Sequence, residues 1–464
     1  MSKSKKITAV VCAFAIVVFG VVFSVAFAVY SEKTVTLLDC NGEVFAQVVE
    51  QGSSKVNKPV HNAYKEYTDY AFNEAVSLYA KEKSVSENAA EKALFRNNAV
   101  IKTAFDTEIC MKILNAFEKS DLSEAYSRCC AVTDNKGSVV AVYGFGTSKS
   151  ITYSTEKRYA CSTVKPLSLY APALNAGIID WSKIYIDEPY KDIINESGEK
   201  EPWPANSWDG YSYDPVTVNE ALVNSYNTVA VKVLKDLSVK RSLDFLEKAL
   251  GFDVTFEREK METQGEDEIL SNVALGYLYK GVSAVDLAGA YSAFANEGNY
   301  SKPHAVISVE SNSGKELFSV EEPVSKPISK QTAFVMTKLL SEVVERGTGK
   351  GARVKGVDVA GKTGTSTGNA DNWFVGYTNE YSCAVWHNNG NNQQDFQGNI
   401  SPKIFADVIK EISAGKTNFA DSCEGVKDAV YCSRSGALKG EKCSDFGGGY
   451  FIERFEKSIC DSCQ

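Results

Sequence analysis

Ser162-Thr163-Val164-Lys165, followed by Ser225-Tyr226-Asn227 and then by Lys362-Thr363-Gly364, is the set of segments that decides the fold of this chain. The three strings have the forms S-x-x-K, S-x-N and K-T-G. In this order they are typical of serine enzymes that use a lysine, not a histidine, for proton transfer. S-x-x-K also occurs elsewhere, for example at Ser197 and Lys200, so one match has little weight, whereas the ordered set is specific.

Ser162 and Lys165 are the first candidate catalytic residues. Apolar residues from Leu167 to Leu174 recur at the spacing of one helix face, which predicts a helix beginning near Ser162. Residues three apart on a helix lie on the same face, so the hydroxyl and the ammonium are expected side by side. A lysine can take the proton of a serine when burial or a nearby positive charge lowers the lysine pKa. Alone, the pair could equally be a helix-capping serine with a solvated lysine.

Ser225 and Asn227 form the second candidate pair. On an extended segment, residues two apart point the same way, so one side chain could relay a proton while the other binds a substrate amide. The alternative is an ordinary helix cap within Asn224-Ser225-Tyr226-Asn227.

Lys362 and Thr363 are expected at the end of an apolar strand that begins at Val357. A cationic lysine beside a hydroxyl suits a substrate carboxylate, and Gly364 leaves room for another backbone segment to approach. The alternative is a strand-end turn. The ordered occurrence of all three motifs favours one shared site.

Composition excludes several other functions. The chain has 464 residues and a net charge of −9, which argues against nucleic acid as a partner. Its three histidines, His61, His304 and His387, lie outside any G-x-S-x-G context, so a Ser-His-Asp triad is not expected. No H-E-x-x-H motif occurs, and the sequence assigns no cofactor and no metal ligands to the site.

The N-terminus predicts a membrane anchor. Lys3, Lys5 and Lys6 precede an uncharged run from Ile7 to Tyr30. That run exceeds the about 20 residues that a spanning helix needs, and the lysines favour a cytoplasmic N-terminus with the rest of the chain outside. The alternative is a cleaved signal peptide with Ala26-Phe27-Ala28 as its cleavage site.

Cysteine content fits an exported chain. There are 12 cysteines, and outside the cytoplasm disulfides are the ordinary expectation. A structural zinc site that uses Cys460 and Cys463 is the alternative. Five cysteines lie near the C-terminus: Cys423, Cys432, Cys443, Cys460 and Cys463.

Periodicity and turn residues predict hairpins on either side of a mainly helical middle, which indicates an α+β fold with an antiparallel sheet. Polar residues 51–58 are expected to form a loop, and Pro172 is expected to kink the helix after Ser162. The expected strands are Thr34–Leu38, Glu43–Val49, Val100–Phe105, Cys130–Thr133, Ser138–Tyr143, Val357–Gly361, Trp373–Tyr377 and Tyr381–Trp386. The expected helices are Asn62–Lys83, Glu108–Phe117, Val216–Leu237, Val239–Leu250, Asn272–Ala295 and Gln331–Glu345.

The motifs and their surroundings resemble the penicillin-binding proteins, in particular the transpeptidase module of the bifunctional class A type. Cys161-Ser162-Thr163-Val164-Lys165-Pro166 is similar to the family's G-S-T-x-K-P, with Cys161 in place of the usual glycine. Further similar segments are 347–349, 360–365 and 371–377, and the resemblance extends from about Ala99 to the end. It implies the penicillin-binding and serine β-lactamase-like fold, an antiparallel sheet flanked by helices plus an all-helical subdomain, preceded by one transmembrane helix.

The resemblance also implies residue roles. Ser162 would attack the penultimate D-Ala carbonyl of a peptidoglycan stem peptide, and Lys165 would be the base, an assignment that is disputed in this family. The N–H groups of Ser162 and Thr365 would form the oxyanion hole, while Lys362, Thr363 and Thr365 would hold the terminal carboxylate. β-Lactams are expected to acylate Ser162.

The implied function is a peptidoglycan D,D-transpeptidase that cross-links stem peptides. The alternatives are a D,D-carboxypeptidase, a non-catalytic β-lactam sensor or wall-binding scaffold, and a β-lactamase. Class A members carry a glycosyltransferase ahead of the transpeptidase, but no E-D-x-x-F motif occurs here, so a separate glycan polymerase is the expected partner. The expected organisation is a cytoplasmic tail (1–6), a transmembrane anchor (7–30), a juxtamembrane or linker region (31–98), a transpeptidase domain (99–416) outside the cytoplasm and a cysteine-rich tail (417–464).

Overall fold

The computed structural model describes residues 33–463, apart from 53, 123–125, 147–151, 196, 208–209, 322, 367, 369, 389–399, 414 and 416. The expected cytoplasmic tail and the expected anchor at 7–30 lie outside the described residues. Within the described residues, no helix is both long enough and apolar enough to cross a membrane.

A five-stranded antiparallel sheet forms the centre of the molecule. Its strand order is β13–β14–β15–β5–β6, so β15 joins two hairpins that are far apart in sequence. This confirms the expected α+β class. The strands are β5 (Arg128–Asp134), β6 (Val139–Phe145), β13 (Ala360–Thr365), β14 (Asp371–Tyr377) and β15 (Tyr381–Asn388).

Helices cover this sheet. α11 (Ala284–Ala295) and α12 (Lys330–Glu345) contact each other and the sheet, and so do α4 (Thr107–Glu118) and α13 (Ile400–Ile412). Every residue of β14 after Asp371 is buried, as expected for a strand covered on both faces.

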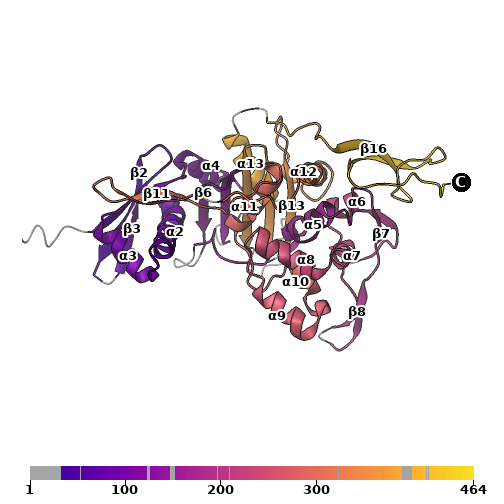
Figure 1. Ribbon diagram of the computed structural model, residues 1–464, viewed down its shortest axis with the longest axis horizontal. Coiled ribbons are helices and arrows are strands. Elements are labelled where there is room, and N and C mark those ends of the chain that lie inside the picture. The colour runs from indigo at the N-terminus through magenta and orange to yellow at the C-terminus, as the bar shows by residue number, and fades with distance from the viewer. Residues whose placement is uncertain are drawn as a thin grey trace, which may run out of the picture.

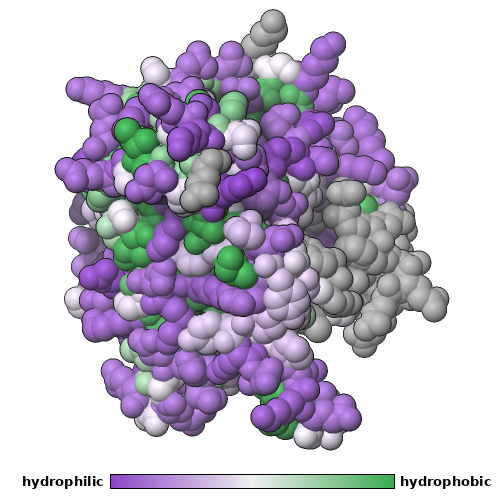
Figure 2. Space-filling view, turned by 90° about the vertical axis from the view of Figure 1, so that its right-hand side faces the viewer, coloured by the Kyte–Doolittle hydropathy of each residue, from purple (hydrophilic) through white to green (hydrophobic). Residues whose placement is uncertain are grey.

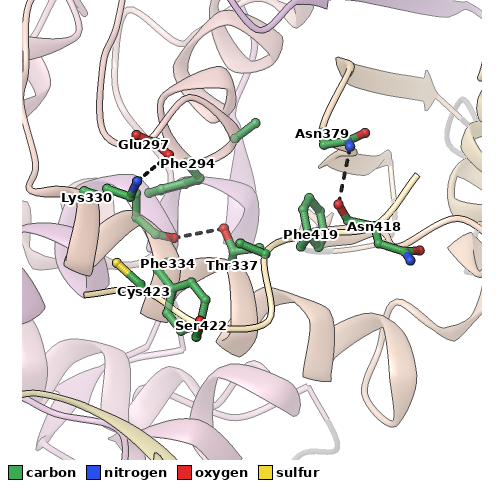
Figure 3. A pocket seen from close by; sticks show the side chains of 13 residues that line it. Phe294, Glu297, Lys330, Phe334, Thr337, Asn379, Asn418, Phe419, Ser422 and Cys423 are labelled. Atoms are coloured by element: carbon green, nitrogen blue, oxygen red, sulfur yellow. Dashed lines mark hydrogen bonds and ion pairs between the residues drawn. The ribbon is translucent and has the colours of Figure 1, made fainter. Parts of the chain in front are cut away.

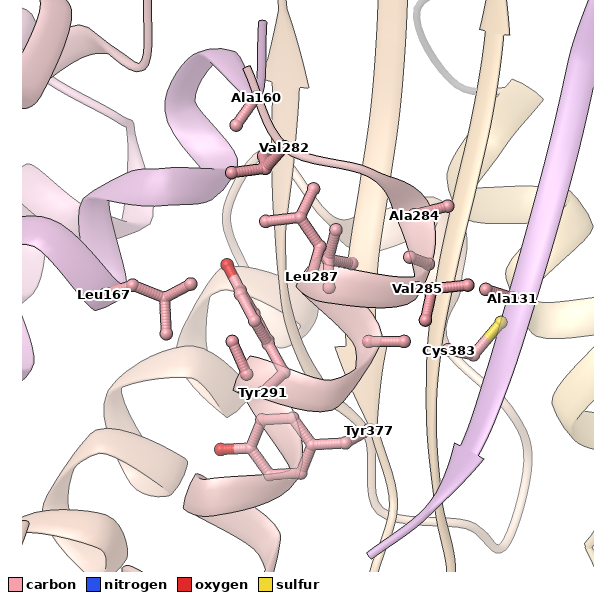
Figure 4. Packing of buried hydrophobic residues seen from close by; sticks show 14 of the residues in the cluster. Ala131, Ala160, Leu167, Val282, Ala284, Val285, Leu287, Tyr291, Tyr377 and Cys383 are labelled. Atoms are coloured by element: carbon pink, nitrogen blue, oxygen red, sulfur yellow. The ribbon is translucent and has the colours of Figure 1, made fainter. Parts of the chain in front are cut away.

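α11 connects the core of the sheet with the segment that carries Ser162. Tyr291 of α11 lies next to Tyr377 of β14, with 6.4 Å between the ring centroids, and Leu167 belongs to the same buried cluster (Figure 4). The Tyr291 hydroxyl donates to the carbonyl oxygen of Thr163 at 2.6 Å. A buried aromatic side chain with a satisfied hydroxyl therefore holds the candidate nucleophile segment against the core.

The helical subdomain departs from the sequence expectation in two places. The helix expected at 216–237 is broken: α6 (Val218–Val223) ends, Ser225 has a left-handed φ of 62°, and α7 (Asn227–Leu237) begins. The helix expected at 272–295 is also two helices, because α10 (Leu270–Leu275) ends at Gly276, whose φ is 85°. The other α-helices of this subdomain are α5 (Ala171–Asn175), α8 (Val239–Asp244) and α9 (Thr255–Gln264).

A six-stranded sheet forms one end of the molecule, and the cysteine-rich tail forms the other (Figure 1). Residues 33–98, expected as a juxtamembrane or linker region, build this sheet together with strands from beyond residue 99. The strand order is β12–β11–β4–β1–β2–β3. The strands are β1 (Thr34–Leu38), β2 (Val44–Gln51), β3 (Ser54–Pro59), β4 (Val100–Thr103), β11 (Val306–Glu310) and β12 (Glu316–Ser319).

The expected loop at 51–58 was wrong. Residues from Ser54 onward form β3, an exposed edge strand that pairs with β2, and its polar side chains face solvent. α2 (Lys65–Lys83) and α3 (Glu87–Arg96) follow it. The carboxylate of Glu66 in α2 accepts hydrogen bonds from the backbone N–H groups of Tyr153 (2.7 Å) and Ser154 (3.0 Å), so this region also supports the segment that leads to Ser162.

The helical subdomain is accompanied by two small two-stranded antiparallel sheets. One pairs β7 (Ile184–Ile186) with β10 (Pro215–Thr217), and the other pairs β8 (Lys191–Ile194) with β9 (Lys200–Trp203). The tail is built on β16 (Val426–Cys432) and β17 (Phe446–Ile452). The expected disulfides do not occur among the described residues, because all the described cysteines are free thiols.

Candidate active site

The segment that carries Ser162 is helical, as expected. Cys161–Val164 forms a 3-10 turn, Pro166–Tyr170 forms a wider π turn, and α5 continues to Asn175. Pro172, where the sequence predicts a kink, is the second residue of α5, which directly follows the π turn, so the regular α-helical hydrogen bonding is interrupted here. Ser162 is half-buried between buried neighbours, so the hydroxyl remains reachable.

Lys165 is fully buried and contacts the S-x-N motif. Its Nζ donates to Oδ1 of Asn227 at 2.6 Å and to the carbonyl oxygen of Ser225 at 2.9 Å. The Ser225 hydroxyl oxygen lies 3.4 Å from the same nitrogen. Burial lowers the pKa of Lys165 well below its usual value, and the positive charge of Lys362 lowers it further. A buried lysine with a lowered pKa can exist as the free amine that general-base chemistry needs.

Lys362 lies within β13 and not at the end of the expected strand, because that strand starts at Ala360 and runs through the K-T-G motif. Its side chain is fully buried, and its Nζ donates to the carbonyl oxygen of Thr363 at 3.1 Å. Burial lowers the pKa of Lys362 to about 7. An anion bound beside this lysine would favour its protonated form.

β13 lies directly against the candidate nucleophile segment at Gly364. A Cβ at this position would lie 2.8 Å from the carbonyl oxygen of Ala160 and 3.3 Å from the nitrogen of Thr163. Only glycine leaves space for this approach of backbone to backbone. Thr365, at the exposed end of the strand, follows Gly364 directly.

Thr363 has a partner that ties the K-T-G strand to the S-x-N motif. The hydroxyls of Thr363 and Thr348 are 2.7 Å apart, and the N–H of Thr348 donates to the carbonyl oxygen of Val223 at 3.3 Å. Val223 is the last residue of α6, directly before the break that carries Ser225. Hydrogen bonds and close packing thus bring all three motifs together.

A buried network that the sequence reasoning missed fixes the orientation of Asn227. The Asp187 carboxylate accepts hydrogen bonds from Asn206 Nδ2 (2.8 Å) and Thr228 Oγ1 (2.6 Å), and Asn206 Oδ1 accepts from the N–H of Asn227 (2.9 Å). The Asn227 side-chain nitrogen donates to a backbone carbonyl at 2.7 Å, which turns its oxygen towards Lys165. These residues belong to no motif, and no sequence signal marks them.

Cys161 adopts a strained backbone conformation, with a left-handed φ of 52°. Its N–H donates to the carbonyl oxygen of Gly276 at 3.1 Å. A Cβ on Gly276 would lie 2.0 Å from the carbonyl oxygen of Cys161. The end of α10 therefore packs directly against the backbone of Cys161, the residue before the candidate nucleophile.

Replacing Gly276 with alanine is expected to destabilise the protein by about 3 kcal/mol, because the methyl group collides with backbone atoms and the φ of 85° is unfavourable for alanine. Gly251→Ala is the matched control: Gly251 has a φ of 74°, but a Cβ there meets nothing within 4 Å, so only the backbone cost of about 1 kcal/mol is expected. Urea unfolding of both variants measures the difference. Equal losses would contradict the close contact with Cys161.

Two cavities lie near the sheet. One of about 590 Å³ is lined by residues that include Arg158 and Tyr159, shortly before Ser162, and Asp371 at the start of β14. A smaller pocket of about 160 Å³ lies between α11, α12 and residues 418–423, and Lys330 and Glu297 form an ion pair at its rim (Figure 3). None of the candidate site residues lines either of these two cavities, although Arg158 and Tyr159 of the larger one shortly precede Ser162 in the sequence.

Comparison with known proteins gives a consistent result. Residues 129–410 match the family profile of the penicillin binding protein transpeptidase domain. The chain is similar to penicillin-binding protein 1A/1B of Bacillus subtilis (30% identical over 378 residues, covering 75% of this chain and 38% of that protein). It is also similar to penicillin-binding protein 1F of Bacillus subtilis (30% identical over 367 residues, covering 75% and 48%). The chain thus spans less than half the length of these relatives.

Solved structures show the same fold. The D,D-transpeptidase domain of a peptidoglycan glycosyltransferase from Eggerthella lenta matches with a TM-score of 0.61 at 19% identity, over 82% of this chain and 98% of that chain. PonA1 from Mycobacterium tuberculosis, in complex with penicillin V, matches with a TM-score of 0.62 at 20% identity, over 77% and 96%.

Proposed function

This chain belongs to the penicillin-binding protein transpeptidase family, and on that basis we propose that it is a peptidoglycan D,D-transpeptidase that works through a serine acyl-enzyme and is acylated by β-lactams. The observation that carries the proposal is the buried amine of Lys165, one helical turn after Ser162 and bonded to both Ser225 and Asn227. A lysine in this position is suited to take the proton of a serine nucleophile.

In the proposed acylation step, Ser162 Oγ attacks the penultimate D-Ala carbonyl carbon of a stem peptide. Lys165 Nζ takes the hydroxyl proton, and an ester bond forms as the peptide bond to the terminal D-Ala breaks. The Ser225 hydroxyl, 3.4 Å from Lys165 Nζ, is positioned to pass the proton to the leaving amine. Free D-Ala then leaves with that proton, so the atoms balance.

Substrate recognition is assigned to β13. We propose that Lys362, Thr363 and Thr365 hold the terminal carboxylate, whose charge would keep Lys362 protonated despite its burial. The N–H groups of Ser162 and Thr365 are proposed as the oxyanion hole, where one donor is typically worth about 3–4 kcal/mol. The close approach of β13 to the nucleophile segment at Gly364 supports both assignments.

The second step decides between transpeptidase and carboxypeptidase. An amine of a neighbouring stem peptide would attack the acyl-enzyme to form a cross-link, whereas water would only hydrolyse it. The cavity of about 590 Å³ lined by Arg158 and Tyr159, which shortly precede Ser162 in the sequence, is the proposed approach for that amine. A D,D-carboxypeptidase, a non-catalytic β-lactam sensor or wall-binding scaffold, and a β-lactamase remain the alternatives.

Cellular placement is part of the proposal. Residues 7–30 would anchor the chain in the cell membrane, with 1–6 in the cytoplasm and the catalytic domain, placed at 99–416, outside. A separate glycan polymerase is the proposed source of the strands to be cross-linked.

The test is product analysis. The full chain in detergent is incubated with a stem pentapeptide ending in D-Ala-D-Ala, with and without an amine acceptor. D-Ala release is expected in both reactions, with the acyl group transferred to the acceptor when it is present. Hydrolysis alone at saturating acceptor would favour the carboxypeptidase, stable acylation by penicillin without any D-Ala release would favour the sensor or scaffold, and rapid turnover of penicillin would favour the β-lactamase.

A further inference from the structure

Four cysteine side chains meet at the far end of the cysteine-rich tail. The sulfur atoms of Cys432, Cys443, Cys460 and Cys463 all lie within 4.8 Å of one another. The sulfur of Cys463 is 3.5 Å from that of Cys432 and 3.7 Å from that of Cys460. Cys432 and Cys443 are buried, whereas Cys460 and Cys463 are half-buried.

From this arrangement we infer that the four thiolates bind one structural zinc ion. Four sulfurs at about 2.3 Å from a central zinc in tetrahedral geometry are about 3.8 Å from one another, close to the two separations given above. A disulfide would instead bring a sulfur pair to about 2.05 Å. Four protein thiolates leave no open coordination position, which is typical of structural and not catalytic zinc sites.

The backbone of the tail is built to bring these sulfurs together. Leu438 lies between the first two cysteines and pairs with Tyr431 on one side and Ile459 on the other. The N–H of Cys460 donates to the carbonyl oxygen of Leu438 at 2.8 Å. A Cβ at Gly440 would lie 2.2 Å from the carbonyl oxygen of Cys460, so this glycine allows the two ligand-bearing segments to touch. The convergence is therefore a property of the tail fold.

A closed turn fixes the position of Cys432. The chain reverses through Gly436, which has a left-handed φ of 72°. The N–H of Gly436 donates to the carbonyl oxygen of Cys432 at 2.8 Å, and the N–H of Cys432 donates to the carbonyl oxygen of Ala437 at 2.8 Å. These two backbone bonds hold the first ligand in place relative to the rest of the cluster.

The small apolar core of the tail is a further reason to expect a stabilising metal ion. Apart from the cysteines, its buried apolar side chains are Tyr431, Phe451 and Ile452. The face of the molecule that carries the tail is mainly hydrophilic, with only small, separate hydrophobic patches (Figure 2). Units of this size rarely bury enough apolar surface to fold on their own, and a bound metal supplies the missing stability.

The zinc-bound tail would support the end of the nucleophile helix. Gly436, in the turn after Cys432, accepts a hydrogen bond from Ser182 Oγ at 2.7 Å. Arg454 donates to the carbonyl oxygen of Asn175 at 2.8 Å, and Lys457 forms an ion pair with Asp180 at 2.5 Å. These contacts fall just after the helical segment that begins with Ser162. The inference does not depend on the proposed function, since it concerns folding.

Metal analysis of the purified full chain tests the inference. The chain is prepared without chelators and measured by elemental mass spectrometry, and about one zinc per chain is expected. The variant Cys460→Ser/Cys463→Ser is expected to lose the zinc. Cys423→Ser, which removes a neighbouring free cysteine outside the cluster, is the matched control and is expected to keep it.

Two further measurements keep the test decisive if the double variant folds poorly. In the wild type, a zinc chelator is expected to lower the melting temperature by several degrees. Alkylation of the wild type in denaturant and chelator, without reductant, is expected to label all four cysteines of the cluster. Unlabelled tail cysteines without bound zinc would show two disulfides and overturn the inference, and so would iron in place of zinc or four reduced thiols with no metal.

Discussion

Replacing Ser162 with alanine is expected to abolish covalent labelling by penicillin, with the rate constant of acylation reduced by at least about 10⁴-fold. The variant lacks the oxygen that forms the ester, and loss of the nucleophile from a serine enzyme typically costs about 10⁶ in rate. The pocket is retained, because the hydrogen bonds of Lys165 and Lys362 do not involve the Ser162 hydroxyl. Reversible binding of penicillin should therefore survive.

Ser168→Ala is the matched control for this variant. Ser168 is buried in the same helical segment, and its hydroxyl has no hydrogen-bond partner in the described structure. Its removal should leave the rate of labelling within about a factor of two, since neither a contact nor a nucleophile is lost. Time-resolved intact-protein mass spectrometry with penicillin measures both rates. Equal labelling of wild type and Ser162→Ala would place the nucleophile elsewhere.

Replacing Lys165 with methionine should reduce the rate of acylation by about 10²–10⁴-fold, the usual contribution of a general base. The loss of acylation rate in this variant should depend on pH. In the wild type, acylation should rise as Lys165 loses its proton, and burial together with Lys362 places that step well below the usual lysine pKa. The methionine variant should lose this rise, because no group titrates in its place.

The variant Lys165→Arg tests whether Lys165 acts through its positive charge or as a base that accepts a proton. Arginine keeps a positive charge and can donate hydrogen bonds, but it does not lose its proton in proteins. The variant should therefore be as impaired as Lys165→Met, while Lys350→Met, on an exposed turn, should acylate like the wild type. Rates over a range of pH provide the check. An arginine variant with near wild-type acylation would mean that Lys165 acts through its charge and not as a base.

Local sequence patterns predicted much of the fold. The first strand has the expected bounds, Thr34–Leu38, because apolar residues alternate along it. The hairpin of β5 and β6 follows from the turn Asp134-Asn135-Lys136-Gly137 between two apolar runs. The order of the three motifs indicated the family, since each motif is a short local string.

Helix breaks and polar strands could not be predicted in this way. Apolar periodicity continues across Ser225 and Gly276, so a pattern of spacing alone suggests one helix where there are two. The strand β3 is exposed and polar, and only its pairing with β2 defines it. In both cases tertiary contacts outweigh local preference.

The candidate site was predictable in its residue types but not in its contacts. Ser225 and Asn227 were singled out from the S-x-N string, yet the bonds from Lys165 to both residues depend on the fold. The support from Asp187 has no sequence signal, because its partners are scattered along the chain. The four-cysteine cluster likewise depends on the pairing of Leu438 with Ile459, which spacing does not reveal.

The most direct test of the central claim is to map the covalent bond in the wild-type chain. The protein is acylated with penicillin, digested, and sequenced by tandem mass spectrometry. The penicilloyl group is expected on the Ser162 oxygen, in the peptide that also contains Lys165. An adduct on any other residue, or no adduct in a folded chain, would contradict the account.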